Sequence, residues 1–451
     1  MSILDDPRLQ LAELEAEIRR VEALLAKLVQ RRVPLKRKIN RRYAHMLSLP
    51  IELCSEIFTA CFPPSSNGPQ TPLLLGSVCT AWRNLAWDMP WLWNNLHLYL
   101  TRPTPTHVDL LEQWLARSAN LPLSIRLTIK LPDPDSDTHT TARLMAALAR
   151  CSKRWHTIDF DVPLFFPDPA LAPSKFPLLA SAAIQVAHIT SPLNLFLTAP
   201  NLHAISLHGF PRNSFNLLWT HITHLRLSPT TVQQCLELLA GAPHLTHCTF
   251  EDITRSDVMN PTPVHAPRLQ SLAIISFTHT PVSELLDTLV LPCALDLAFH
   301  VTGNTFPYWS FAALIARSGC RPRRLALTAV RISEWQLWEC LQAVPSLLAL
   351  RLAHIDRLTN ETLRALNPTA AHPLLPVLHE FHYTGPLVPD LPTLTNTLCA
   401  RWTGTAPLQK FTFTTSASAP GPTGDVHQAR IRALVEDGMD VSIVTREGAW
   451  I

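Results

Sequence analysis

Near the start of the chain, hydrophobic residues recur at alternating spacings of three and four positions. The residues concerned are Leu11, Leu14, Ile18, Val21, Leu25 and Leu28. This heptad spacing predicts a helix with one apolar stripe, flanked by charged residues such as Glu15 and Arg19. Pro34 is expected to end or kink the helix. About three heptads indicate either a homodimeric coiled coil through residues 11–28 or a helix that packs on its own domain.

A basic stretch, 31-RRVPLKRKINRR-42, overlaps the end of this pattern and holds seven Lys and Arg residues. Such a stretch is typical of a nuclear-localisation signal or a nucleic-acid patch. It contains no interleaved aromatic residues on which bases would stack, so a solvated connector is favoured and no nucleic-acid partner is expected.

The next segment predicts two short apolar helices joined by a loop of turn-forming residues. Ser48 and Pro50 are suited to start the first helix, in which Leu53, Ile57 and Cys61 share a stripe. The loop 63-PPSSNGPQTP-72 precedes a second helix with apolar residues at Leu74, Val78, Trp82 and Leu85, and 89-MPWLWNNLHLYL-100 ends in a strand-like alternation. About fifty residues cannot bury so many large side chains alone, so some must face the next domain or a partner.

Residues 47–96 resemble an F-box. The shared pattern is L-P-x-E-L-x-x-x-I-F, then V-C-x-x-W-R-x-L-A-x-x-x-P-x-L-W, and it is carried here by Leu49-Pro50, Glu52-Leu53, Ile57-Phe58, Val78-Cys79, Trp82-Arg83, Pro90 and Trp93. The segment is most similar to the F-box-like proteins of mushroom-forming (basidiomycete) fungi, which often begin with a short heptad helix. Thr80 departs from the basic residue that usually follows V-C, and the first loop is slightly long.

The resemblance implies docking onto the small Skp-type adaptor of a cullin–RING ubiquitin ligase, and through it onto a cullin. It assigns adaptor contact to Leu49, Pro50, Ile51, Leu53, Ile57 and Phe58, with Val78, Cys79 and Trp82 as helix-packing and secondary contacts. The alternative is that these residues pack on the following domain, which is favoured for Trp82, Trp87 and Trp93.

From about residue 120 a short apolar alternation recurs at steps of about twenty to thirty-one residues. The copies are 202-LHAISL-207, 222-ITHLRL-227, 245-LTHCTF-250, 269-LQSLAI-274, 292-PCALDL-297, 322-PRRLAL-327, 347-LLALRL-352, 378-LHEFHY-383 and 408-LQKFTF-413, with weaker ones at 155-WHTIDF-160 and 182-AAIQVAHI-189. The unit resembles a degenerate leucine-rich repeat that lacks the usual Asn after the strand. It predicts a parallel-stranded solenoid with helices on its convex side.

Together these patterns predict an α/β protein with three parts. A heptad helix and basic connector occupy residues 1–46, a small all-α F-box-like domain occupies 47–100, and a leucine-rich-repeat-like α/β solenoid occupies 101–451. A helix followed by a strand in 425-DVHQARIRALVEDGMDVSIVT-445 is expected to cap the solenoid.

In each repeat the residue between the last two apolar positions should point outward, onto the concave face. These residues are Ser206, Arg226, Thr249, Ala273, Asp296, Ala326, Arg351, His382 and Thr412, with His224, His247, Arg324, Glu380 and Lys410 beside them. We expect Arg226, Asp296, Arg324, Arg351 and His382 to bind a target protein, on a mildly basic face suited to an acidic segment. The alternative is a merely solvated sheet face.

Composition narrows the class of protein. The net charge of +3 is too small to indicate binding to nucleic acid or to a membrane. The chain has only 12 glycines but 40 prolines, which argues against phosphate-binding loops. Ten scattered cysteines without a C-x-x-C pair indicate free thiols in a reducing compartment. With no signal sequence or apolar membrane span evident, a cytoplasmic or nuclear location is expected.

No catalytic motif stands out. The segment 133-DPDSDT-138 has the aspartate spacing of a calcium loop but lacks its glycine and its closing carboxylate, and three His-x-x-His pairs (His221/His224, His244/His247 and His379/His382) lack further ligands. We therefore expect no metal, no cofactor and no enzymatic activity.

The favoured hypothesis for the whole chain is a substrate-recognition subunit of a cullin–RING ligase. The alternatives are a non-ligase scaffold with the F-box helix packed on its own solenoid, and a hydrolase with an unrecognised site.

Overall fold

The computed structural model describes residues 7–43, 49–61, 71–130, 138–164, 175–188, 196–209, 219–255, 262–302, 305–355, 358–416, 424–446 and 448–451. They divide into two units, each described below by itself: one reaches Trp93 and includes Arg117–Ala119, and the other holds the rest of the chain. None of the described helices is both long and apolar enough to cross a membrane.

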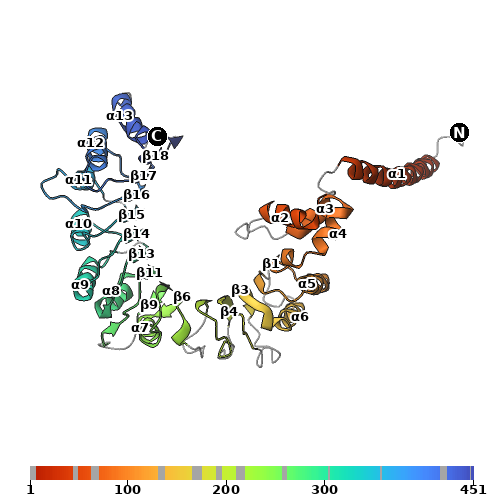
Figure 1. The fold of residues 1–451 in the computed structure, drawn as a ribbon, viewed down its shortest axis with the longest axis horizontal. Helices are drawn as coiled ribbons and strands as arrows, with labels where there is room; N and C mark the ends of the chain where they lie inside the picture. The colour runs from red at the N-terminus through yellow and green to blue at the C-terminus, as the bar shows by residue number, and fades with distance from the viewer. Residues whose placement is uncertain are drawn as a thin grey trace. The chain divides into compact units, whose positions relative to one another are not determined.

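The first unit begins with a long helix, α1 (Pro7–Tyr43), which is drawn in red in Figure 1. The helix continues through Pro34 instead of ending there, and it includes the whole basic stretch 31–42. Residues on both sides of Pro34 are strong helix formers such as Leu, Lys and Arg, which explains why one proline does not end it. The apolar stripe of α1 is exposed: Leu14, Val21 and Leu28 keep 51–59% of their surface.

Three shorter helices follow: α2 (Ile51–Cys61), α3 (Thr71–Val78) and α4 (Thr80–Trp87), and then a 3₁₀ turn, η3 (Pro90–Leu92). The single second helix predicted from the sequence is therefore two helices. Cys79 breaks it, because its backbone is extended (φ −158°, ψ 169°) and its Sγ accepts a hydrogen bond from the Trp82 backbone nitrogen at 3.5 Å. Ser48, the expected cap of α2, lies outside the described residues.

The core of this helical unit is aromatic. The Phe58 ring is fully buried, with its centroid 5.2 Å from that of Trp82. Trp93 is also buried, and its Nε1 donates to the Ala86 carbonyl at 2.8 Å. The Arg117 guanidinium lies over the Trp93 ring at 4.9 Å, a favourable cation–π distance. These contacts hold the short helices together.

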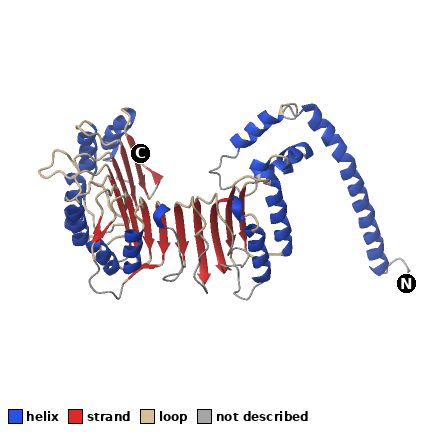
Figure 2. Cartoon of the chain, turned by 60° about the horizontal axis from the view of Figure 1, so that its bottom comes forward, coloured by secondary structure: helices blue, strands red, loops and turns tan. Residues whose placement is uncertain are grey.

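The second unit is a parallel sheet with helices along one face (Figures 1 and 2). Among the described residues, fifteen strands form this sheet in chain order. The strands are β1 (Asn95–Leu100), β2 (Leu123–Ile129), β3 (Trp155–Leu164), β4 (Ser181–His188), β5 (Ala204–His208), β6 (His224–Ser228), β8 (His247–Glu251), β11 (Ser271–Ser276), β13 (Asp296–Val301), β14 (Arg324–Thr328), β15 (Ala349–Ala353), β16 (Glu380–Gly385), β17 (Lys410–Thr415), β18 (Asp440–Thr445) and β19 (Gly448–Ala449). Because β1 pairs with β2, the sheet starts at Asn95, slightly ahead of the boundary expected near residue 100.

Helices and minor strands connect these strands. The helices are α5 (Pro105–Arg117), α6 (Thr138–Ala149), α7 (Val232–Gly241), α8 (His279–Thr288), α9 (Tyr308–Ser318), α10 (Glu334–Gln342), α11 (Asn360–Ala365), α12 (Leu391–Trp402) and α13 (Gly424–Glu436), with 3₁₀ turns η4 (Ser152–Arg154) and η5 (Trp219–His221). Two small parallel pairs join β7 (Thr230–Thr231) to β9 (Ile253–Thr254) and β10 (Val264–His265) to β12 (Leu289–Val290).

The predicted repeats coincide with the strands from β5 to β17, and their paired apolar residues form the core. In β6, for example, Leu225 and Leu227 are 3% and 0% exposed. One repeat is displaced from its predicted register: β13 begins at Asp296, so Leu297 and Phe299 are the core residues. The Phe299 ring packs 5.3 Å from Phe306, and burying this large side chain determines the register.

Threonine side chains link successive repeats ahead of the strands. Thr223 Oγ1 donates to the His203 carbonyl at 3.1 Å, and Thr246 Oγ1 donates to the Thr223 carbonyl at 3.0 Å. Each bond links one repeat to the next just before the strand begins. These hydroxyls therefore give the backbone carbonyls at the start of each strand a partner in the next repeat.

Arginines at helix ends provide a second link between repeats. In α12, Arg401 is 1% exposed and donates to the carbonyls of Leu366 (2.6 Å), Leu374 (2.7 Å) and Leu375 (2.8 Å). Burial lowers the pKa of Arg401 to about 10, so the side chain is charged at neutral pH. Arg317 in α9 likewise binds carbonyls of the preceding repeat.

The chain end closes one edge of the sheet. After α13, β18 adds one more parallel strand, and β19 pairs with it in the antiparallel direction. Trp450 and Ile451 also exchange backbone hydrogen bonds with Ile443. The second half of β18 therefore has backbone partners on its outer side.

Replacing Arg401 with Met should destabilise the solenoid strongly. The change leaves buried carbonyls without donors, and we expect a loss of about 2–4 kcal/mol in the free energy of unfolding. Urea unfolding followed by circular dichroism measures it. Arg364→Met, in which an exposed arginine loses only its ion pair with Glu361, should change the free energy by less than about 0.5 kcal/mol. Equal urea midpoints for the two variants would contradict the role given to Arg401.

Candidate functional site

The first candidate surface lies on α2. Leu49, Leu53 and Ile57, spaced by four residues, are 38%, 45% and 37% exposed, and Ile51 is 52% exposed. The opposite face of the helix holds the buried Cys54 and Phe58. The helix is therefore anchored by one face and presents aliphatic side chains on the other. Ile51, in the first turn, lies seven residues before Phe58 and therefore on the side of the buried face, but it is exposed. We call Leu53 and Ile57, together with Leu49 just before the helix and Ile51 at its start, the outer stripe of α2.

Four aliphatic side chains on one short helix are suited to bind a protein. An anchored helix loses little conformational freedom on binding, so more of the burial energy appears as affinity. Residues of this kind, once fully buried at the centre of an interface, typically cost about 2 kcal/mol or more when truncated.

Of the other predicted adaptor residues, Phe58 is buried, whereas Pro50 and Val78 are exposed. The prediction that Phe58 contacts the adaptor is wrong for this structure. The ring is fully buried against Trp82 and forms part of the core of the unit. Pro50 is exposed, and its carbonyl accepts the first helical hydrogen bond of α2, from Cys54. Val78 is 58% exposed.

Cys79 and Trp82 have structural contacts. Cys79 caps α4 through its sulfur, and Trp82 is half-buried against Phe58. Sequence reasoning did not single out Leu73, which with Leu74 adds exposed apolar surface on α3. Leu73 and Leu74 belong to a T-P-L-L-L run that would suit a buried helix equally well. The sequence therefore gave no signal that these two leucines are exposed.

The second candidate surface is the helix-free face of the sheet, which we call the open face. Strand register arranges its side chains in rows that cross the sheet. One row runs His224, His247, Ser271, Asp296, Arg324, Ala349, Glu380, Lys410 and Asp440, and the next runs Arg226, Thr249, Ala273, Ala298, Ala326, Arg351, His382 and Thr412. Asp296 thus lies directly beside Arg324 instead of in the row of Arg351, and Ala298 takes the predicted place of Asp296.

Ion pairs between neighbouring strands neutralise much of the open face. Arg324 binds both carboxylate oxygens of Asp296 at 2.7 Å, and Lys410 lies 2.9 Å from Asp440. These hydrogen bonds raise the pKa of Arg324 and of Lys410. Arg226 is paired in the same way with Glu251, at 2.6 Å. The mildly basic character expected from the sequence is therefore largely cancelled locally.

Arg351 differs from these residues. In the described strands, each of the other exposed Arg and Lys residues of the open face has a carboxylate partner. For Arg351, which is also exposed, no carboxylate partner is found there. Its neighbours in the row are Ala326 and His382, and two more alanines, Ala298 and Ala273, continue the row beyond Ala326. The result is a strip of small side chains that ends at an unpaired guanidinium.

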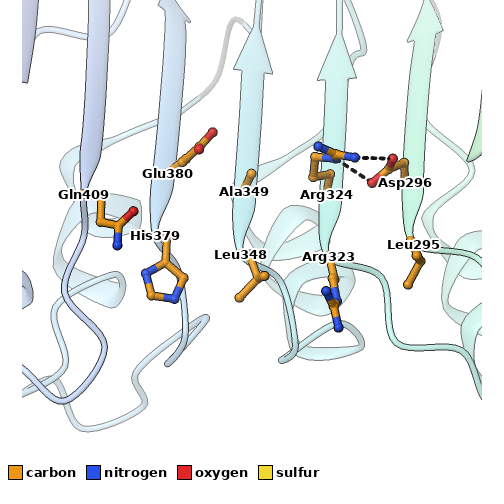
Figure 3. A pocket seen from close by; sticks show the side chains of 9 residues that line it. All are labelled: Leu295, Asp296, Arg323, Arg324, Leu348, Ala349, His379, Glu380 and Gln409. Carbon is orange, nitrogen blue, oxygen red and sulfur yellow. Dashed lines mark hydrogen bonds and ion pairs between the residues drawn. The ribbon is translucent and has the colours of Figure 1, made fainter. Parts of the chain in front are cut away.

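A hollow of about 380 Å³ lies beside this strip, centred on Ala349 (Figure 3). It exists because Ala349 stands in the row between two long side chains, Arg324 and Glu380. Arg323, Leu348 and His379 line it at the edge where the strands begin. His379 is held there by a contact of 3.0 Å between its Nδ1 and the Pro407 carbonyl. An exposed hollow with both charges and a small floor is suited to one inserted side chain of a partner.

The histidine pairs do not assemble as sequence spacing suggested. The rings of His224 and His247, from neighbouring strands, stack with centroids 4.4 Å apart, while His244 contacts Arg268. Thr223 and Thr246 hold the two stacked rings through their hydroxyls, each at 2.9 Å from an Nδ1. A second hollow, of about 240 Å³, lies beside the stack.

The described part of the chain contains no group of three or more His, Cys, Asp or Glu residues able to hold a metal ion. Most of the segment 133–138, which we interpret from the sequence as an ordinary loop, lies outside that part, through Asp137. Burial raises the pKa of Cys235 and of Cys340 to about 12, so these two thiols are not reactive thiolates.

Acidification should weaken the histidine stack. Burial, followed by the charges of His247 and His203, lowers the pKa of His224 below its usual 6.5. A lowered folded-state pKa favours the neutral ring, so its contribution to stability is present above pH 6.5 and is lost as pH falls through the folded-state value. The urea midpoint should therefore fall more between pH 7.5 and 5.5 for the wild type than for His224→Asn. Parallel pH profiles for the two proteins would contradict this.

Comparison with known proteins identifies no family for this chain. No family model matches the chain, and no curated protein matches it. Among solved structures it is similar to the leucine-rich repeat domain of APL1, at 15% identity and a TM-score of 0.33, covering 71% of this chain and 86% of that one. The parallel strand register and the L-x-x-L-x-L spacing of this chain themselves define a leucine-rich-repeat-like solenoid.

Proposed function

We propose that this protein is the substrate-recognition subunit of a cullin–RING ubiquitin ligase. In this proposal the outer stripe of α2 binds the Skp-type adaptor, and the open face of the solenoid binds a target protein. The observation that carries it is the exposure of Leu53 and Ile57 on one face of a helix whose other face is buried, with Leu49 and Ile51 exposed at the start of the helix.

The sequence motif and the geometry support the adaptor contact independently. The F-box-like pattern assigns Leu49, Pro50, Ile51, Leu53, Ile57 and Phe58 to the adaptor, and all of them except the buried Phe58 are exposed. Large aliphatic side chains on a monomer surface are often functional when they cluster. The cluster here lies where the motif places the contact.

The target would bind across the strip of alanines that ends at Arg351. A carboxylate of the target can pair with Arg351 without displacing another partner, while apolar groups lie over Ala298 and Ala326. The chain itself would catalyse nothing and needs no cofactor. It would raise the effective concentration of the target near ubiquitin carried by other subunits, in the cytoplasm or nucleus, without binding nucleic acid or membrane.

A protein-interaction scaffold outside any ligase is the alternative. In that case the outer stripe of α2 would be covered by the protein's own repeats in solution, and the adaptor would not bind. Substitutions in the stripe would then lower stability instead of affinity, so the two proposals predict opposite results for the same variants.

The double substitution Leu53→Ala/Ile57→Ala should raise the Kd for purified Skp-type adaptor at least thirtyfold. Each truncated anchor costs about 2 kcal/mol at a central position, and the unfolding midpoint should stay the same because both residues are exposed. Isothermal titration calorimetry and thermal unfolding measure the two quantities. Leu110→Ala, at a leucine of α5 that is 56% exposed, is the control and should bind normally. Failure of the wild type to bind, or a lowered midpoint with unchanged affinity, would refute the adaptor role.

Ala349→Trp should block target binding without affecting the adaptor. The indole would fill the hollow between Arg324 and Glu380 on the open face. Proteins that accumulate when the gene is deleted should return to normal abundance with the wild type but stay elevated with Ala349→Trp, as measured by quantitative proteomics. The control Ala313→Trp, on an exposed position of α9, should restore their levels. Full restoration by Ala349→Trp would exclude this hollow as part of the target site.

A further inference from the structure

The exposed stripe of α1 is longer than the sequence analysis predicted. Beyond Leu28 it continues through Leu35 and Ile39, which are 62% and 56% exposed. With Leu11 at heptad position a, the a and d positions are Leu11, Leu14, Ile18, Val21, Leu25, Leu28, Arg32, Leu35 and Ile39. The seam therefore covers about four heptads, enough for an independent coiled coil. Arg32 is its polar a residue, and Pro34 falls at position c, away from the seam.

Charges beside this seam are segregated along the helix. The e and g positions of the first half carry Glu15, Glu17 and Glu22. Those of the second half carry Arg31, Lys36 and Lys38. Within the described residues no ion pair is found for these side chains, which are all exposed. Residues at e and g determine partner choice and orientation in coiled coils, so this pattern selects a partner.

A parallel pair of α1 helices would be repulsive. In a parallel coil each g residue faces the e residue five positions on in the other helix. Glu17 would then face Glu22, and Arg31 would face Lys36. Arg32 would also meet Arg32 of the second copy in the seam, where like charges are most unfavourable.

An antiparallel pair removes each of these conflicts. With Leu14 packed against Ile39 of the second copy, Ile18 meets Leu35 and Leu25 meets Leu28. In that register Glu15 faces Lys36 and Glu17 faces Lys38, each twice by symmetry. Arg32 then lies against Val21, next to Glu22.

We propose that α1 binds α1 of a second copy of this chain as an antiparallel coiled coil in this register. The charge complementarity of the two halves of the helix, together with an exposed apolar seam, identifies the occupant as the same helix reversed. The inference goes beyond the proposed function and does not depend on adaptor or target binding.

Charge reversal at one end of the helix tests orientation as well as association. In the full chain, Glu15→Lys/Glu17→Lys places lysines against Lys36 and Lys38 of an antiparallel partner, and should raise the dimer Kd roughly tenfold or more. In a parallel dimer the same change would place the lysine introduced at position 17 against Glu22 and tighten association. Lys36→Glu/Lys38→Glu should likewise weaken the antiparallel dimer. Sedimentation equilibrium measures each Kd.

Restoration and a matched control complete the experiment. Mixing the two double variants should restore association, because every facing pair then has opposite charges. Glu17→Lys should weaken the dimer, whereas Glu13→Lys, the same change at position c away from the seam, should leave Kd within about twofold. A wild type that stays monomeric at tens of micromolar, tighter association of Glu15→Lys/Glu17→Lys, or no restoration on mixing would overturn the proposal.

Discussion

The structure depends on one constraint: each repeat can bury its two strand leucines only against the strands on either side. An isolated unit has too little surface to form a core, so every strand requires its neighbours in the same parallel register. Leu350 and Leu352, both 0% exposed, illustrate how complete this burial is. The links made by Thr223, Thr246 and Arg401 supply backbone partners between successive repeats. Stability is therefore a sum of contacts between neighbours along the solenoid.

The same register creates the open face. Because side chains alternate across a strand, fixing the leucines inward fixes the intervening residues outward and aligns them in rows. Arg324 meets Asp296 and Lys410 meets Asp440 because they occupy equivalent positions of adjacent repeats. Where consecutive repeats carry alanine, as at Ala298 and Ala326, the rows leave a strip of small side chains. The arrangement of side chains on the open face is thus a consequence of the core.

Much of this architecture is predictable from sequence because the regular spacing of apolar residues indicates each repeat. The sequence-based predictions are wrong where a local feature overrides that spacing. Phe299 needs burial and shifts its repeat by two residues, which moved Asp296 out of its predicted row. Cys79 interrupts an apolar run that otherwise reads as one helix. Which face of α2 is buried could not be predicted, because Phe58 and Ile57 are both apolar and only the contact with Trp82 distinguishes them.

The two candidate surfaces differ in the physics of binding, and this difference suits a receptor. The outer stripe of α2 is aliphatic, so burying it gives affinity that depends little on salt. The open face instead presents exposed ion pairs, each worth about 0.2–1 kcal/mol, whose members a charged ligand can recruit at small cost. Charges of this kind contribute selectivity and association rate more than affinity. Under the proposed function, the apolar stripe would supply a constant attachment to the adaptor and the polar open face would supply selectivity for the target.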